Sequence, residues 1–421
     1  MPVPNKIKQQ IDEHSGSLEN FRLEGSSDDN HSLKNKLRGK RVIGAGEATH
    51  SSKEFNRLRR QIFQLLVEEL DYRIFAWEAS FGETLEINNY VVDGDGTAEE
   101  ALSSVSSPNC KTEEVLELIH WIREYNKQVS DRQKVRFYGF DMQNDTACFK
   151  KLREIMQKVD SDFVRANEDT LEFIEQGKMM FAEIDEERET ELRDFIKDFQ
   201  TQVESKQDKY LEIISEREYR LLKQLVVILE QCRKFCLAVN ENADYEIDSW
   251  AFRDKCMAEN ISWMMNFEDE ENAFVWAHNA HVKKGGKPED PESNSLGYYL
   301  QQKYRDNYYA IGFDFGTGAF KYLNMEQPQP DWNGEESFKE VHENTLAKEL
   351  SVIQEPFFLD FSGTSINILE EWINQKHRIH SVGTYFHLDN VEDHYDNICR
   401  SEGFDGLIFV PKVTASKPLR P

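Results

Sequence analysis

Arg41-Val42-Ile43-Gly44-Ala45-Gly46-Glu47-Ala48-Thr49-His50 is a short apolar run that breaks at two glycines and ends in Glu-x-x-His. The apolar residues predict a buried strand, and Gly44 and Gly46 mark its end. In open α/β sheets, ligands bind outside the carboxyl ends of the strands. Glu47 and His50 are therefore candidate active-site residues.

Four further apolar runs also end in polar side chains. They are 73–77, followed by Glu78; 135–140, followed by Asp141; 273–277, followed by His278 and His281; and 308–313, followed by Asp314. Shorter strand candidates lie at 356–361, 378–382 and 406–410. Because parallel strands end at one edge of a sheet, these polar side chains are expected to converge on one cleft.

Helical patterns separate the strand candidates. Apolar residues recur at three- and four-residue spacing over 54–70 and 112–128, and residues 148–267 show helical spacing with almost no strand pattern. This alternation predicts one α/β domain over 1–421, with a mostly parallel sheet and helices on both faces. Residues 148–267 are expected to form a helical insertion that caps the active-site cleft.

The composition argues against several classes of partner. The chain has 51 Lys and Arg against 78 Asp and Glu, a net charge of −27, which disfavours nucleic-acid binding. Such a surface usually keeps a protein in solution, and a preference for cationic substrates is the alternative interpretation. There is no apolar leader and no run of about 18 apolar residues, so we expect no membrane partner and a cytoplasmic location. The sequence leaves the oligomeric state open.

The pattern of motifs favours water as the attacking group. The sequence has no Gly-x-Ser-x-Gly, no Cys beside a strand end, no phosphate loop and no dinucleotide fingerprint. A His of near-neutral pKa can take a proton from water while a carboxylate fixes its tautomer. A zinc site is the alternative, with His50, Glu78, His278 and His281 as ligands. Because His278 and His281 lack the helical His-Glu-x-x-His spacing, we prefer hydrolysis without a metal or other cofactor.

Five ordered motifs carry a family resemblance. They are Gly46-Glu47-Ala48-Thr49-His50, Glu54-Phe55 with Arg59, Trp77-Glu78-Ala79, Tyr138-Gly139-Phe140-Asp141-Met142-Gln143 and Ala277-His278-Asn279-Ala280-His281. Over roughly residues 35–410 the chain resembles the erythromycin esterase family, including its succinoglycan-biosynthesis-like relatives. The resemblance implies an α/β core with a helical section over the cleft.

The resemblance also implies an activity, which is hydrolysis of the lactone ester in 14-membered macrolides such as erythromycin, conferring macrolide resistance. His50 matches the general base of the family, Glu78 a carboxylate that orients the water or the imidazole, and Arg59 an arginine expected to stabilise the oxyanion. His278 and His281 match the second His pair. Whether Glu47 or Glu78 orients the water stays open. An esterase of the same family that acts on a different ester, such as a polysaccharide acyl group or a secondary metabolite, is the alternative hypothesis.

The substrate contacts are predicted from the chemistry of a macrolide. Its protonated amino sugar suits an acidic cleft, and its large apolar ring needs aromatic walls. The candidate substrate-binding residues are Phe81, Trp121, Asp141, Asp314 and Phe315. One departure from the family pattern is Ser51-Ser52, where relatives more often have Gly-Thr, and Ser51 is expected to alter the backbone or add a hydroxyl beside His50. A protein that binds the ligand without turnover is the non-enzymatic alternative.

Overall fold

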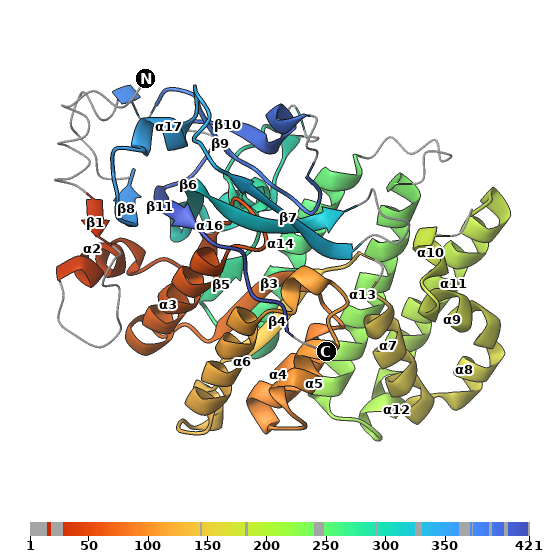
Figure 1. The fold of residues 1–421 in the computed structure, drawn as a ribbon. Coiled ribbons are helices and arrows are strands. Elements are labelled where there is room, and N and C mark those ends of the chain that lie inside the picture. Colours follow the sequence, from red (N-terminus) through yellow and green to blue (C-terminus); the bar gives the residue numbers. More distant parts are fainter. Residues whose placement is uncertain are drawn as a thin grey trace.

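A mixed sheet forms the centre of the computed structural model, which describes residues 15–17, 28–143, 145–181, 184–239, 248–288, 290, 293–324, 331–361, 371–372, 374–386, 390–399 and 403–419. Within these residues the sheet has nine strands in the order β1-β8-β11-β6-β2-β5-β3-β4, with β7 paired to β6 (Figure 1). Their bounds are β1 Ser15–Ser17, β2 Val42–Ala45, β3 Ile74–Ser80, β4 Arg136–Asp141, β5 Ala273–Trp276, β6 Tyr308–Asn324, β7 Asp331–Phe338, β8 Phe357–Asp360 and β11 Gly406–Val413.

The middle of the sheet is parallel, as the sequence predicts. All pairs from β11 through β6, β2, β5 and β3 to β4 are parallel. Antiparallel pairing occurs toward the other edge, where β8 pairs with β11 and β1, and where β7 pairs with β6. The predicted strand at 378–382 is β9 His377–His380, which pairs with β10 Tyr395–Ile398 in a separate two-stranded sheet.

Helices cover both faces of the sheet. Neighbouring residues of β2 separate into two cores, because successive side chains of a strand point to opposite faces. One core includes side chains of α3 Lys53–Leu70, α4 Thr84–Asp93, α5 Ala98–Ser103 and α6 Glu113–Asn126, and of α2 Asp28–Leu37. The other includes side chains of α14 Ser249–Glu268, α15 Asn279–Val282, α16 Leu296–Tyr304 and α17 Leu346–Leu350.

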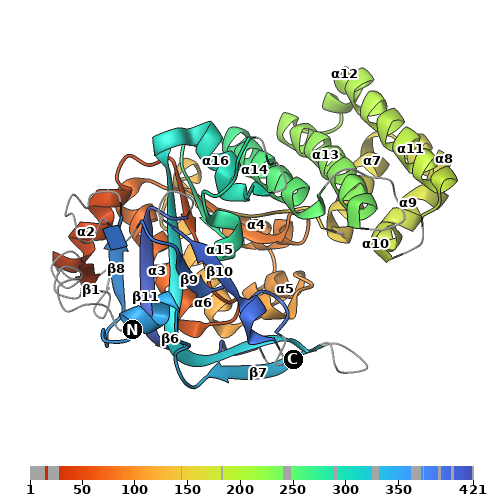
Figure 2. The same ribbon diagram turned by 90° about the horizontal axis from the view of Figure 1, so that it is seen from above.

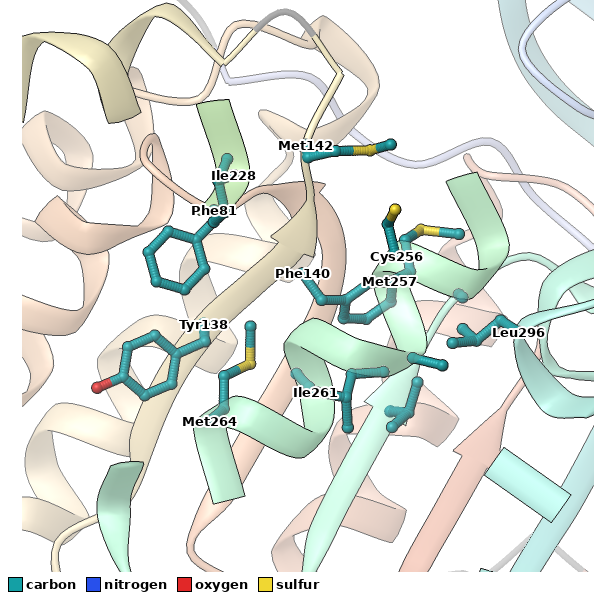
Figure 3. Close-up of a cluster of buried hydrophobic side chains, with 14 of the residues drawn as sticks. Phe81, Tyr138, Phe140, Met142, Ile228, Cys256, Met257, Ile261, Met264 and Leu296 are labelled. Atoms are coloured by element: carbon teal, nitrogen blue, oxygen red, sulfur yellow. The ribbon is translucent and has the colours of Figure 1, made fainter. Parts of the chain in front are cut away.

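The described residues between β4 and β5 are helical and contain no strand. They form α7 Thr146–Val159, α8 Ser161–Ala166, α9 Glu168–Glu175, α10 Lys178–Phe181, α11 Glu186–Ser205, α12 Gln207–Leu211, α13 Glu216–Val239 and α14. In Figure 2, α7 to α13 stand beside the sheet and α14 lies between them and the rest of the molecule. The apolar residues of α14 pack on β4, as Figure 3 shows for Met257, Ile261 and Met264 around Phe140 and Tyr138.

One strand differs from its prediction in a way that affects the site. The apolar run at 308–313 was expected to end at Asp314, but β6 is 17 residues long and runs from Tyr308 to Asn324. The continuation is held by β11 as far as Gly318 and then by β7. Asp314 therefore lies inside a strand and not at its carboxyl end.

None of the helices in the described part of the chain is long and apolar enough to cross a membrane.

Candidate active site

The carboxyl ends of four adjacent strands meet around one cavity. The strands β2, β5, β3 and β4 are neighbours and parallel, so their ends share one edge of the sheet. The cavity there has a volume of about 180 Å³. Its lining comprises Glu47, His50, Asn56, Trp77, Glu78, Ala79, Ser80, Glu83, Val105, Ser106, Ser107, Asn109, Cys110, Val115, Asp141, Gln143, Arg253, Trp276 and Thr384. Polar side chains at or near the ends of these apolar strands thus lie around the same cavity.

Gly46 and Asn279 fix the backbone that carries Glu47. The side chain of Asn279 accepts from the N–H of Phe313 (3.0 Å) and donates to its carbonyl (2.7 Å), while its own N–H donates to the carbonyl of Glu47 (2.9 Å). A Cβ on residue 46 would lie 2.1 Å from Oδ1 of Asn279. Only glycine fits this close approach, so the second glycine of the opening motif is a packing requirement of the site.

His50 and Glu47 form the first half of the site. Nδ1 of His50 lies 2.7 Å from Oε1 of Glu47. Burial by itself raises the pKa of Glu47, but the charges of Arg59 and His50 outweigh it and hold the pKa below its ordinary value. Burial lowers the pKa of His50, and its hydrogen bond to Glu47 and the charge of that carboxylate more than compensate, so the pKa is raised. When His50 is neutral, Nδ1–H donates to Glu47 and the lone pair is on Nε2.

Arg59 lies behind Glu47 and has no exposed surface. Its Nη2 is 2.6 Å from Oε2 of Glu47 and donates to Oδ1 of Asn56 (2.7 Å). Its guanidinium carbon lies 3.3 Å from the ring centroid of Trp276, a close cation–π contact. Arg59 is fully buried and does not line the cavity, so the oxyanion contact expected of it stays a prediction. It holds the carboxylate that holds His50.

His278 is a buried neutral imidazole beside His50. It is the N-cap of α15, where its Nδ1 accepts from the N–H of Ala280 (3.2 Å), and its ring centroid is 5.2 Å from that of His50. Burial, followed by the nearby His50, lowers its pKa to about 3. Because Nδ1 accepts, the proton of the neutral ring is on Nε2. Within the described residues this Nε2 has no hydrogen-bond partner.

Glu78 and His281 belong to a second charged network, which also contains Asp254, Arg253 and Asp141. Oε2 of Glu78 accepts from the N–H of His278 (2.8 Å), and Oε1 is 3.1 Å from Nε2 of His281. Nδ1 of His281 is 2.6 Å from Asp254. Burial acts against both charges, but the neighbours prevail: Asp254 and Glu78 raise the pKa of His281 to about 10, and His281 and Arg253 hold that of Glu78 well below its ordinary range. His281 is an imidazolium at neutral pH.

Arg253 from α14 closes this network. Its guanidinium donates to Glu78 (3.0 Å) and to Asp141 (2.8 Å), and it lies 3.1 Å from Nε2 of His281. Asp141 also accepts from the N–H of Met142 (2.8 Å), so it shapes its own loop as well as the cavity wall. Although Arg253 is remote in sequence, it is the arginine of the cavity lining among the described residues.

Arg253 and Asp254, on a helix inside the long helical segment, were not among the residues predicted for the site. With the exposed Lys255 they form an Arg-Asp-Lys run between Ala251-Phe252 and Cys256-Met257. The side chains of Arg253 and Asp254 are buried in a helix that has buried residues around its circumference. A charged pair inside such a helix is the signal that could have identified them, since buried charges need partners.

Four predicted substrate contacts do not line the cavity. Phe81 is buried in the core against Tyr138 and Trp263, and Figure 3 shows it beside Tyr138. Trp121 packs against Phe63 and Tyr125 in the core on the other face of the sheet. The remaining two are internal residues of β6: Asp314 is buried and bonded to His380, and Phe315 stacks on the same ring. Of the five predicted contacts, Asp141 reaches the cavity.

Ser51 does not add a hydroxyl to the cavity. Its Oγ donates to the carbonyl of Lys321 (2.7 Å) and accepts from the N–H of that residue (2.6 Å). The side chain that departs from the family pattern therefore attaches the residue after His50 to β6. Its effect is on the backbone, which is the first of the two expected effects.

No group of three or more His, Cys, Asp and Glu side chains in the described ranges is arranged to hold a metal ion. Nδ1 of His50 and both ring nitrogens of His281 face carboxylates. Of the four side chains that the sequence suggested for zinc, His50, Glu78 and His281 are thus engaged with charged partners, whereas His278 has no such partner among the described residues.

Comparison with known proteins identifies the family of this chain. A sequence model described as erythromycin esterase matches residues 67–413. The chain belongs to the erythromycin esterase family. Erythromycin esterase type II of Escherichia coli is 25% identical over 313 residues, which are 69% of this chain and 73% of that protein. The putative hydrolase YbfO of Bacillus subtilis is 23% identical over 314 residues, 70% of this chain and 69% of that protein.

The fold of the family member described here is also found in solved structures. A crystal structure of a succinoglycan biosynthesis protein superposes with a TM-score of 0.80 at 20% identity, covering 99% of each chain. At this identity the likeness establishes the fold. The motif that carries Glu47, His50 and Arg59 lies before the matched range 67–413, so its place in the site rests on the geometry above.

Proposed function

We propose that this member of the erythromycin esterase family hydrolyses a carboxylic ester by direct attack of water, with His50 as the general base. The observation that carries the proposal is the Arg59–Glu47–His50 chain at the edge of the cavity. It fixes Nδ1–H toward Glu47 and leaves the Nε2 lone pair of His50 to take a proton from water. Glu47 is therefore the carboxylate that positions the base.

His278 supplies the complementary group. Its Nε2–H is a neutral, buried donor near His50 that lies behind the cavity lining, and we propose that substrate binding brings it to the negative charge that develops on a carbonyl oxygen. Water attacks the carbonyl carbon as its proton passes to Nε2 of His50. The tetrahedral intermediate then collapses, the ester C–O bond breaks, and the His50 imidazolium protonates the leaving alkoxide. The products are a carboxylic acid and an alcohol, and His50 is neutral again.

Glu78, Arg253 and Asp141 form the opposite wall in this proposal, with His281 behind Glu78. Each oxygen of Glu78 already accepts from an ordered donor, so Glu78 acts mainly by fixing the backbone of His278 and by its charge. Through Arg253, α14 connects the predicted helical cap at 148–267 to the cavity. Movement of α14 and the helices beyond it is the proposed route by which the cap opens and closes over a substrate.

The first substrate we propose is the lactone of a 14-membered macrolide, following the family. A second candidate, a smaller ester, is favoured by the size of the cavity. Its volume of about 180 Å³ is below the range of about 300–1,000 Å³ that is typical of pockets for drug-sized ligands. The aromatic side chains of its lining are Trp77 and Trp276, and a macrolide ring would extend beyond them.

A second, larger cavity of about 540 Å³ lies between α11, α13 and α14. It is lined by none of the residues predicted for catalysis and contains no His, so we do not assign the reaction to it.

The test is incubation of the purified protein with erythromycin, other 14-membered macrolides and a series of smaller acyl esters. Mass spectrometry should detect a product heavier by one water for a lactone, or the separated acid and alcohol for an open-chain ester. Hydrolysis of the small esters alone would select the second candidate. Binding without turnover of any ester would contradict the proposal and favour a binding protein. Loss of activity with a chelator and recovery with zinc would favour the metal-dependent alternative.

A further inference from the structure

The residues at the C-terminal end of the described chain reach the back of the site. Residues 414–419, here called the C-terminal strap, follow β11 and run past the start of α3 and the start of α6. The N–H of Ser416 donates to the carbonyl of Ser51 (2.8 Å), and the N–H of Lys53 donates to the carbonyl of Thr414 (2.9 Å). The strap is thus attached to the segment that directly follows His50.

One side chain of the strap bonds to the catalytic machinery. Oγ of Ser416 accepts from Nδ2 of Asn56 (2.9 Å), and Oδ1 of Asn56 accepts from Nη2 of Arg59 (2.7 Å). Ser416, Asn56 and Arg59 are 2%, 3% and 0% exposed, so water does not compete with these hydrogen bonds. From Arg59 the contacts continue through Glu47 to His50.

The orientation of the Asn56 amide is the critical feature. An amide has a donor end and an acceptor end, and only the acceptor end is compatible with a guanidinium. Ser416 takes the donor end, which turns Oδ1 toward Arg59. When the Ser416 hydroxyl is removed, a buried N–H of Asn56 loses its hydrogen-bond partner. The orientation of the amide that places Oδ1 against Arg59 is then no longer stabilised from the other end.

We propose that Ser416 and Asn56 are positioning residues that set the orientation of the general base His50 through Arg59 and Glu47. The inference rests on the proposed function of His50, but it makes a prediction about His50 that does not require a substrate. Both Asn56 and Ser416 lie outside the range matched by the family, 67–413. The strap therefore completes the site from a part of the chain 360 residues away from Asn56.

The groups that face His50 decide the direction of the effect. They are Glu47 from the segment after β2, Glu78 from β3, and His278 and His281 at the end of β5. Burial lowers the pKa of His50, and the bond to Glu47 raises it. If Ser416→Ala loosens Arg59 and Glu47, the Glu47–His50 bond is populated less and the pKa of His50 falls.

The experiment compares full-length Ser416→Ala with Thr414→Val. The control removes another strap hydroxyl, which donates to Glu54 (2.8 Å) and does not contact Asn56. The readout is the NMR titration of the His50 ring, with its signal assigned by its loss in His50→Asn. We expect Ser416→Ala to lower the pKa of His50 relative to the wild type and Thr414→Val to leave it unchanged. Ser416→Thr, which keeps the hydroxyl, should have the same His50 pKa as the wild type.

Activity gives a second, separate readout. On any ester that the wild type hydrolyses, Ser416→Ala should reduce kcat by about tenfold with little change in KM, because a small misplacement of the base costs rate while the strap touches no substrate. An unchanged His50 titration in a Ser416→Ala protein that unfolds at the same temperature as Thr414→Val would overturn the inference. If the titration shifts while no ester is hydrolysed, the positioning role stands and the proposed function fails.

Discussion

At the scale of single residues, the site separates two kinds of imidazole. His50 is held at Nδ1 by Glu47 and has a raised pKa, whereas His278 is held at Nδ1 by a backbone N–H and has a pKa lowered to about 3. In the proposed reaction the same type of side chain serves as a proton acceptor in one position and as a neutral donor in the other. Environments that separate the pKa values of neighbouring groups are a mark of acid–base catalysis.

This separation predicts the pH dependence of the reaction. Only neutral His50 accepts a proton from water, so kcat/KM should rise with pH through the pKa of His50, which lies above its ordinary value of 6.5, and then level off. Glu47→Gln removes the charge that raises this pKa, so the rising limb should move to lower pH and the plateau should fall, on the order of 100-fold. The measurement is a pH profile of kcat/KM for both proteins.

The control is Glu83→Gln, since Glu83 lines the same cavity and its carboxylate accepts from the N–H of Ser106. In Glu83→Gln, kcat/KM should rise over the same pH range as in the wild type. Equal displacement of the limb in both variants would mean that the charge of the cavity as a whole, and not the bond to Glu47, sets the pKa of His50.

At the scale of elements, the ends of β2, β4 and β5 were predictable from the sequence, because each is an apolar run that stops at a polar side chain, whereas β3 continues past Glu78 to Ser80. The end of β6 was not predictable, since its continuation depends on pairing with β7 and β11. Asp314 and Phe315 were misplaced for that reason. Arg253 and Asp254 are marked only by their charge within a buried helix, and Ser416 carries no local pattern, because the roles of all three depend on contacts with residues far away in the sequence.

The turn after β2 yields a prediction about packing. Gly46→Ala would place Cβ 2.1 Å from Oδ1 of Asn279, which cannot move away without losing its two bonds to Phe313. We expect a loss of about 1–3 kcal/mol in the free energy of unfolding, as for other overpacked sites, together with reduced activity. Denaturant unfolding measures the first effect.

Gly383→Ala is the matched control, because a Cβ there meets nothing within 4 Å. It should unfold close to the wild type. If both alanine variants are equally stable, the close contact at Gly46 does not constrain the segment that carries Glu47.

At the scale of the whole molecule, the excess of acidic residues has a local counterpart. The net charge is −27, and the cavity is lined by Glu47, Glu78, Glu83 and Asp141 against the cation Arg253. A negative potential that extends from the surface into a cleft attracts cationic substrates and is screened by salt. The acidic lining is compatible with both interpretations of the net charge, which are a preference for cationic substrates and an acidic surface that keeps the protein in solution.

A pair of esters of equal shape separates these two interpretations. We expect kcat/KM for an ester with a trimethylammonium group to fall by about tenfold as the ionic strength rises, since steering is screened. The ester with a neutral tert-butyl group in its place should change little. Similar salt dependence for both esters would show that the acidic surface does not steer the substrate.

The central claim, that His50 activates water for ester hydrolysis, is tested most directly by comparing the wild type with His50→Asn on the same ester panel. The control is His120→Asn, which changes a solvent-accessible histidine on α6, far from the cavity lining. We predict that His50→Asn loses about 100- to 10,000-fold in hydrolysis rate while its unfolding temperature stays that of the control. Hydrolysis by a folded His50→Asn protein at the wild-type rate would contradict the account.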